Sequence, residues 1–120
     1  MLSLSFGLLL IAALLGSGLG AQHLRATPPA WPLGALHGLL GASGLVVLLF
    51  ALRGPPHGEA MGIASFGRIA AVLLALALLA GIAILVARLR YRNIPGLVIG
   101  IHATIAVSGI VILAAYALVG

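Results

Sequence analysis

The sequence predicts an all-α membrane protein, a bundle of four transmembrane helices that forms one domain over residues 1–120. Of the 120 residues 63% are hydrophobic and only 6% are charged, and the apolar residues fall into four long runs. Soluble domains average about 25% charged residues, so the bilayer is the expected solvent. Four spans of about 20 residues each account for most of the chain and leave only short loops.

The first two spans form the first half of the chain. Leu2–Leu19 is apolar and uncharged, and it differs from a signal peptide because no Lys or Arg precedes it and the run is longer than usual. Residues 21–32 are polar and rich in proline, which predicts a loop. Pro32 suits the first turn of a helix, where its missing N–H costs nothing. The second span is therefore expected over Leu33–Leu52.

The second half of the chain repeats this arrangement. Residues 53–59 form a turn-rich connector, and a third apolar run follows over Gly62–Ala87. Its one charge, Arg68, lies near the start and can reach the lipid headgroups. Residues 88–93 form a short basic loop, and the fourth span is expected from Pro95 to about Leu118.

The charges and aromatic residues predict an orientation. Four of the six arginines lie in the first and third loops, whereas Arg53 and Arg68 are on the other side. The positive-inside rule then places both termini outside, in the periplasm of a bacterial inner membrane. The arginine-rich, lysine-free composition is typical of GC-rich bacterial coding. The aromatic residues at span ends, expected to form an interfacial belt, are Trp31, Tyr91 and Tyr116.

Several function classes are disfavoured by composition. The net charge of +5, with Glu59 the only acidic residue, is explained by topology and does not indicate a nucleic-acid partner. No cysteine is present, so thiol chemistry is excluded. Hydrolysis would need paired carboxylates, a nucleophile with an adjacent base, or a phosphate-binding loop, and the sequence shows none of these. Transport would favour acidic residues within the membrane, and the apolar spans contain none. Whether the chain is itself an enzyme is left open.

The second and fourth spans share a pattern that predicts a duplicated helical hairpin. Residues 37–46 align with residues 102–111, and His, Ser and Gly recur at identical offsets. The tripeptide Ser-Phe-Gly at 5–7 also recurs at 65–67. Repeats of two spans enter the membrane in the same sense, which gives a pseudo-two-fold axis along the membrane normal. The repeats would cover about 2–52 and 62–118.

The duplicated histidines, His37 and His102, suggest a b-type haem. Two neutral imidazoles on opposing helices can supply both axial ligands of one iron. The fourth and seventh residues after each histidine return to its helix face and are small, which predicts a flat slot for the macrocycle. These residues are Gly41, Gly44, Ala106 and Gly109. The arginines expected near the haem propionates are Arg25, Arg88, Arg90 and Arg92.

On these histidines and their small neighbours, the chain resembles the small four-helix membrane cytochromes b, in which histidine pairs from different helices hold haem. The resemblance implies electron transfer within the membrane, with a quinone or a partner subunit. Many members carry two haems and four intramembrane histidines. Here His23 and His57 lie in loops, where they are expected to be solvated, so a single haem is predicted.

Other interpretations stay open. The histidines could only bond neighbouring helices while the glycines allow close packing, although two intramembrane polar side chains favour a function. Each histidine could instead bind one chlorophyll-type pigment. The chain could also be an accessory or anchor subunit of a larger respiratory or photosynthetic complex, or a homo-oligomer. A zinc site is disfavoured because two histidines leave a tetrahedral ion two ligands short.

Overall fold

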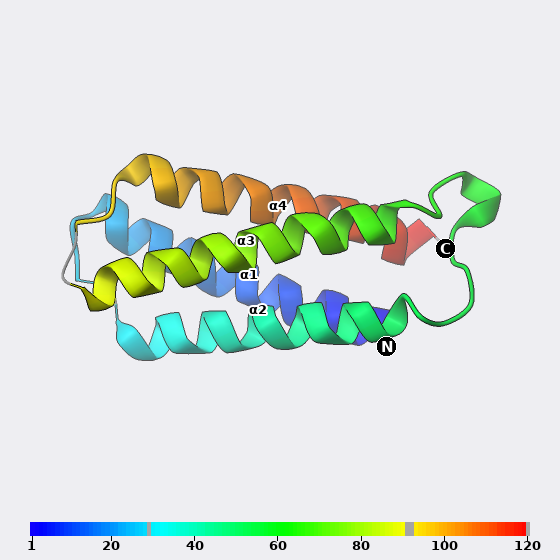
Figure 1. Cartoon of the computed structure of the whole chain (residues 1–120), viewed down its shortest axis with the longest axis horizontal. Coiled ribbons are helices and arrows are strands. Elements are labelled where there is room, and N and C mark those ends of the chain that lie inside the picture. The colour runs from blue at the N-terminus through cyan, green and yellow to red at the C-terminus, as the bar shows by residue number, and fades with distance from the viewer. Residues whose placement is uncertain (29, 91–92, 120) are drawn as a thin grey trace.

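The computed structural model describes residues 1–28, 30–90 and 93–119, and its four long helices confirm the predicted all-α fold class (Figure 1). Each helix is long and apolar enough to cross a membrane. The bundle measures 48 Å along its longest axis, close to the roughly 40–45 Å of a bilayer with its headgroups. The helices are α1 (Leu2–Leu24), α2 (Trp31–Ala51), α3 (Phe66–Leu89) and α4 (Gly96–Val119).

The end of α1 and the start of α2 differ from the predicted boundaries because of the residues at those positions. α1 continues past Leu19 to Leu24 because helix-forming residues such as Ala21 and Gln22 follow. α2 starts at Trp31, two positions before the predicted Leu33, with the proline in its first turn. The fourth span agrees with the prediction to within one residue at each end.

α3 starts later than predicted, at Phe66 instead of Gly62. The connector contains a short 3-10 helix, η1 (Glu59–Met61), between two left-handed glycines. Gly58 has φ 74° and Gly62 has φ 70°, a conformation that ends a right-handed helical segment. Gly62 therefore ends the 3-10 helix and is not part of α3, which begins four residues later.

The first loop begins with a helix end that lacks the usual glycine. Ala26 has a positive φ of 52°, and its N–H donates to the carbonyl of His23 while the N–H of Thr27 donates to the carbonyl of Gln22. This is the Schellman pattern, in which glycine normally supplies the left-handed residue. The alanine holds this conformation at a cost of about 1 kcal/mol.

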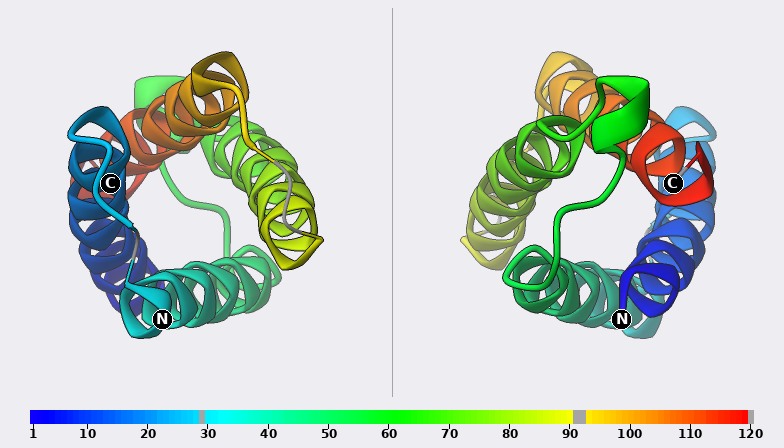
Figure 2. Two further views of the ribbon diagram at one scale, coloured as in Figure 1. Left: turned by 90° about the vertical axis from the view of Figure 1, so that its left-hand side faces the viewer. Right: turned by 90° about the vertical axis from the view of Figure 1, so that its right-hand side faces the viewer.

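The helices follow one another around the bundle, so α2 lies diagonally across from α4 (Figure 2). α1 packs extensively on α2, and α3 on α4, whereas the contacts between these two hairpins are sparser. We call the end where residues 52–65 join α2 to α3 the connector end; both termini lie there (Figure 1). The opposite end, where the α1–α2 and α3–α4 segments lie, is the loop end.

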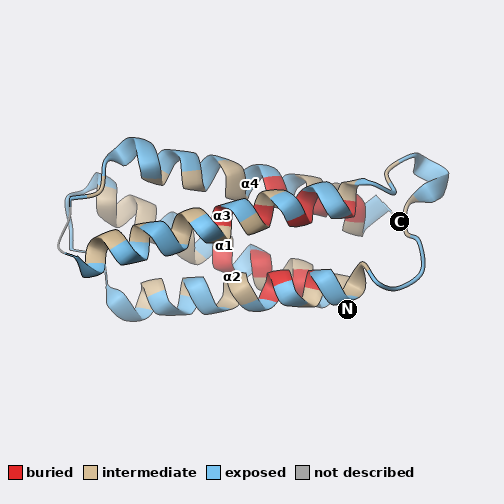
Figure 3. Cartoon of the chain, viewed as in Figure 1, coloured by how far each residue is buried: buried red, intermediate tan, exposed pale blue. Residues whose placement is uncertain are grey.

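The tightly packed core occupies the connector half of the bundle (Figure 3). No described residue within 13–43 or 78–108 is buried. The hairpins are therefore packed firmly together near the connector and loosely toward the loop end. The buried cluster consists of Leu9, Leu45, Leu48, Ala70, Ala71, Leu74, Leu113 and Tyr116.

Candidate functional site

The structure brings His37 and His102 together between the two hairpins, in the half of the bundle nearer to the loop end. Their ring centroids lie 6.1 Å apart and the ring planes meet at 82°. Both side chains are half-buried. Each histidine is six residues from the start of its helix, which is about 9 Å along the axis at 1.5 Å per residue. The pair thus lies where the tight core gives way to the looser half.

Each histidine is oriented by a hydrogen bond within its own hairpin. Nδ1 of His37 lies 2.7 Å from the carbonyl oxygen of Ala12, and Nδ1 of His102 lies 2.8 Å from that of Ala77. A carbonyl oxygen only accepts, so Nδ1 carries the proton in both rings. In a neutral imidazole this leaves the lone pair on Nε2, the tautomer suited to metal ligation. Neither Nε2 is hydrogen-bonded to another described residue.

A glycine on the adjacent helix makes room for each ring. A Cβ on Gly16 would lie 2.8 Å from Cε1 of His37, and one on Gly81 would lie 3.2 Å from Cε1 of His102. Any side chain at these positions would push against the ring. Neither glycine was among the predicted site residues. The signal that could have found them is their equal sequence distance from the two histidines.

Gly44 and Gly109 each face a leucine of the neighbouring helix in their hairpin, and their contact with a cofactor stays a prediction. A Cβ on Gly44 would lie 2.6 Å from Cγ of Leu9, and one on Gly109 would lie 2.9 Å from Cγ of Leu74. Both glycines are buried. They allow close packing of the two helices within each hairpin.

The other two predicted slot residues have more space around them. No described atom lies within 4 Å of a Cβ built on Gly41, and Ala106 is only half-buried. These two positions remain beside the histidines as candidates for contact with a cofactor. A cofactor slot lined by the four small residues stays a prediction.

Equivalent contacts within the two hairpins are made by residues that lie a constant number of sequence positions apart. The positions of His37 and His102 differ by 65, as do those of Ala12 and Ala77. The glycines and leucines that pack within each hairpin keep the same separation. The Ser-Phe-Gly tripeptides at 5–7 and 65–67 differ by 60 positions and are outside this register, so that match does not reflect structural equivalence.

The predicted arginines lie at the loop end, away from the histidine pair. Arg25 and Arg90 are the residues that follow α1 and α3, and both are exposed. Each is nine residues beyond the glycine beside a histidine ring, about 14 Å at 1.5 Å per residue. Arg88 is half-buried in the last turn of α3. Arg92 lies outside the described residues. A role of these arginines toward haem propionates stays a prediction.

The remaining histidines and aromatic residues partly depart from expectation. His57 is not freely solvated: its ring packs edge-on against Tyr116 at 5.0 Å, and its Nε2 is buried with no partner among the described residues. Tyr116 is only 6% exposed, so it belongs to the core and not to an aromatic belt. Trp31 is 81% exposed, while Tyr91 lies outside the described residues. His23 lies in the last turn of α1 and not in a loop, and it is half-buried near the start of α4.

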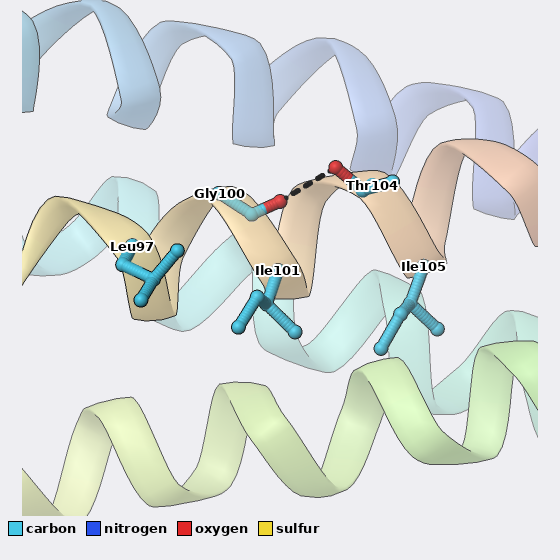
Figure 4. A pocket seen from close by; sticks show the side chains of 5 residues that line it. All are labelled: Leu97, Gly100, Ile101, Thr104 and Ile105. Atoms are coloured by element: carbon cyan, nitrogen blue, oxygen red, sulfur yellow. Dashed lines mark hydrogen bonds between the residues drawn. The ribbon is translucent and has the colours of Figure 1, made fainter.

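Two shallow grooves of the described surface contain no histidine. The first, of about 330 Å³, lies on α4 around Gly100 (Figure 4). Because Gly100 and Thr104 are two residues either side of His102, they fall on the opposite face of the helix. The second, of about 270 Å³, lies around Arg68 at the start of α3. Both are grooves of the outer surface, so the histidine pair remains the candidate site.

No protein-family model, no curated protein and no solved structure matches this chain. The functional argument therefore depends on the chemistry of the site itself. Among the described residues no group of three or more His, Cys, Asp or Glu could hold a metal ion. The donor set is a pair of imidazoles, which suits an ion whose remaining ligands come from a cofactor.

Proposed function

We propose that this chain is an integral membrane b-type haem protein that holds one haem between His37 and His102 and relays electrons within the membrane. The observation that carries the proposal is the separation of the two rings. Metal–imidazole bonds are about 2 Å long, and the ring centroids lie 6.1 Å apart, so the two rings are close enough to hold one ion between them.

The residues around the pair fit such a group. Both imidazoles are protonated on Nδ1 by the argument from their carbonyl partners, which leaves Nε2 as the ligand atom. Two lone pairs near each other in an apolar bundle favour a cation between them. The looser packing between the hairpins toward the loop end is where a macrocycle could be accommodated.

The protein side chains would control the properties of the iron. The haem itself supplies one-electron redox chemistry when bound. The Nδ1–H bonds to the carbonyls of Ala12 and Ala77 fix the ring orientation and raise the basicity of Nε2. The apolar helices around the pair keep water away, which also tunes the redox potential. His37 and His102 are thus the metal ligands, and their carbonyl partners are positioning groups.

The proposal extends to location and partners. An excess of arginine at the loop end favours an orientation in which this end faces the cytoplasm and both termini face the periplasm of a bacterial inner membrane. The histidine pair is nearer to the loop end than to the connector end. We propose that the electron partner, a quinone or a subunit of a larger membrane complex, exchanges electrons from the loop end.

A second candidate function is supported by the same hydrogen bonds. Each imidazole already bonds a carbonyl of the neighbouring helix, as a purely structural histidine would. The chain would then be an accessory or anchor subunit of a respiratory or photosynthetic complex. Separate chlorophyll-type pigments on the two histidines are disfavoured, because rings 6.1 Å apart leave no room for two macrocycles between them.

A reduced-minus-oxidised absorption spectrum of the purified full chain, with pigment extraction, tests the proposal. We expect sharp low-spin haem bands in the wild type and their loss in His37→Ala and in His102→Ala. His23→Ala is the matched control and should retain haem, because that side chain lies at the loop end. A full haem complement in the double histidine variant would refute the ligand assignment. A colourless protein from haem-sufficient cells would favour the accessory subunit.

A further inference from the structure

The loop end concentrates positive charge, and none of its described residues is acidic. Arg25 follows the end of α1, Arg88 lies in the last turn of α3, and Arg90 follows the end of α3. The only acidic residue of the sequence is Glu59, which lies in η1 at the connector end (Figure 1). Among the described residues no acidic side chain lies beside these arginines, which favours binding of an external anion.

The charges form two equivalent segments, one at the C-terminal end of each of the diagonally placed helices α1 and α3. Residues 23–25 are His-Leu-Arg and residues 88–90 are Arg-Leu-Arg, separated by the same 65 positions as the two histidines of the candidate site. The backbone is also alike: Arg25 has φ −87° and ψ 5°, and Arg90 has φ −92° and ψ 15°. The loop end thus carries two positively charged segments of similar sequence and backbone conformation.

The side chains of both segments suit the membrane interface. The central leucines are strongly exposed, Leu24 at 87% and Leu89 at 70%. An exposed leucine at the end of a transmembrane helix can contact acyl chains, while the flanking long basic side chains reach the headgroups. Guanidinium groups bind phosphate oxygens through two parallel hydrogen bonds. Leucine and arginine together match both parts of a phospholipid.

We propose that each of these two segments binds an anionic phospholipid through its phosphate-bearing headgroup. The α3 segment is the stronger site because it carries two permanent charges, whereas the α1 segment carries one arginine and a histidine. Each arginine near an anionic surface should strengthen lipid binding about fivefold. The haem plays no part in lipid binding, so the lipid proposal can fail without affecting the proposed function.

Trp31 provides a probe at the same end of the bundle. It is the only tryptophan of the chain, it is the first residue of α2, and it is 81% exposed. The full-length protein is reconstituted in phosphatidylcholine vesicles that contain a small, equal fraction of brominated phosphatidylglycerol or brominated phosphatidylcholine. Bromine quenches tryptophan emission on contact, and the ratio of the two quenching efficiencies reports lipid preference near Trp31.

We expect brominated phosphatidylglycerol to quench several-fold more efficiently than brominated phosphatidylcholine. The double variant Arg88→Gln/Arg90→Gln should lose most of this preference. Arg53→Gln/Arg68→Gln is the matched control: it also removes two charges, both at the connector end, where the Arg53 guanidinium lies 5.1 Å from the centre of the Phe50 ring and Arg68 lies in the first turn of α3. It should keep the preference. Circular dichroism confirms that each variant is helical.

Two results would overturn the proposal. Equal quenching by both lipids in the wild type would mean that the arginines only offset the negative helix C-termini. An equal loss of preference in Arg53→Gln/Arg68→Gln and in the loop-end variant would mean that net charge alone attracts the lipid. The haem-free variant His37→Ala/His102→Ala should keep the lipid preference, which separates this proposal from the proposed function.

Discussion

The α1–α2 and α3–α4 hairpins are alike around their histidines and differ at the connector end. In both, Nδ1 of the histidine bonds a carbonyl of the neighbouring helix, and a glycine lies against the ring. At the connector end Ser5 of α1 is matched by Ala70 of α3, both fully buried, and only Ser5 donates a hydrogen bond, to the carbonyl of Gly44. The feature that occurs twice is the orientation of the imidazole, which supports a shared role for the two rings.

The largest effect is expected where a glycine permits helix contact. Gly44→Ala would place Cβ 2.6 Å from Cγ of Leu9, and Gly109→Ala would place it 2.9 Å from Cγ of Leu74. Overpacking of this kind lowers the free energy of unfolding by about 1–3 kcal/mol. Gly44→Ala should lose more stability than Gly109→Ala because its contact is shorter. Unfolding in SDS measures both. Gly41→Ala, which meets no described atom within 4 Å, is the control and should not destabilise the bundle. Equal stability of all three would show that the hairpins are looser than the contacts indicate.

The next prediction concerns the glycines beside the histidine rings. Gly16→Ala brings Cβ to 2.8 Å from His37, whereas Gly81→Ala brings it to 3.2 Å from His102. Both should weaken haem retention, and Gly16→Ala more so, by about tenfold if the shorter contact costs roughly 1.4 kcal/mol more. Titration of the haem-free protein with haem measures the affinities. Gly20→Ala, whose Cβ would meet no described atom within 4 Å, should bind haem like the wild type. A larger loss in Gly81→Ala would reverse the predicted ranking.

A smaller effect tests the difference between Ser5 and Ala70. Ser5→Ala removes the 2.9 Å hydrogen bond to Gly44 and should cost about 0.6–1 kcal/mol, as for other hydrogen bonds between membrane helices. Ala70→Ser places a hydroxyl at the equivalent position of α3 and should recover part of this loss in the double variant. The measurement is the unfolding free energy of all four proteins. No recovery would show that the hairpins are not equivalent at this position.

The smallest effect is expected at the end of α1. Ala26→Gly removes the cost of a left-handed alanine at φ 52° and should stabilise the protein by about 0.5–1 kcal/mol. This change affects only the first hairpin. Ala21→Gly, inside the helix, is the opposite control and should destabilise by about 1 kcal/mol. Destabilisation by both glycines would mean that the turn after α1 differs from the one described.

The four helices and the meeting of the histidines were accessible from the sequence, whereas the packing roles of single residues were not. Span length and apolar composition determine the helices because a bilayer allows few alternatives. The duplicated pattern placed His37 and His102 at equivalent positions. The partners of Gly44 and Gly109, however, lie on other helices, and small residues look alike whether they face a cofactor or a leucine. The burial of His57 against Tyr116 depends on the path of the connector, which sequence periodicity does not reveal.

The hydrogen bonds of the two histidines also bear on how the protein assembles. Each spans only 25 residues of sequence and closes within a single pair of adjacent helices. A chain delivered to the membrane from its N-terminus can therefore fix the His37 ring before the second pair of helices has been synthesised. We expect each helical hairpin to form in the bilayer with its imidazole already oriented. The last step of folding is then the packing of the two preformed hairpins against each other.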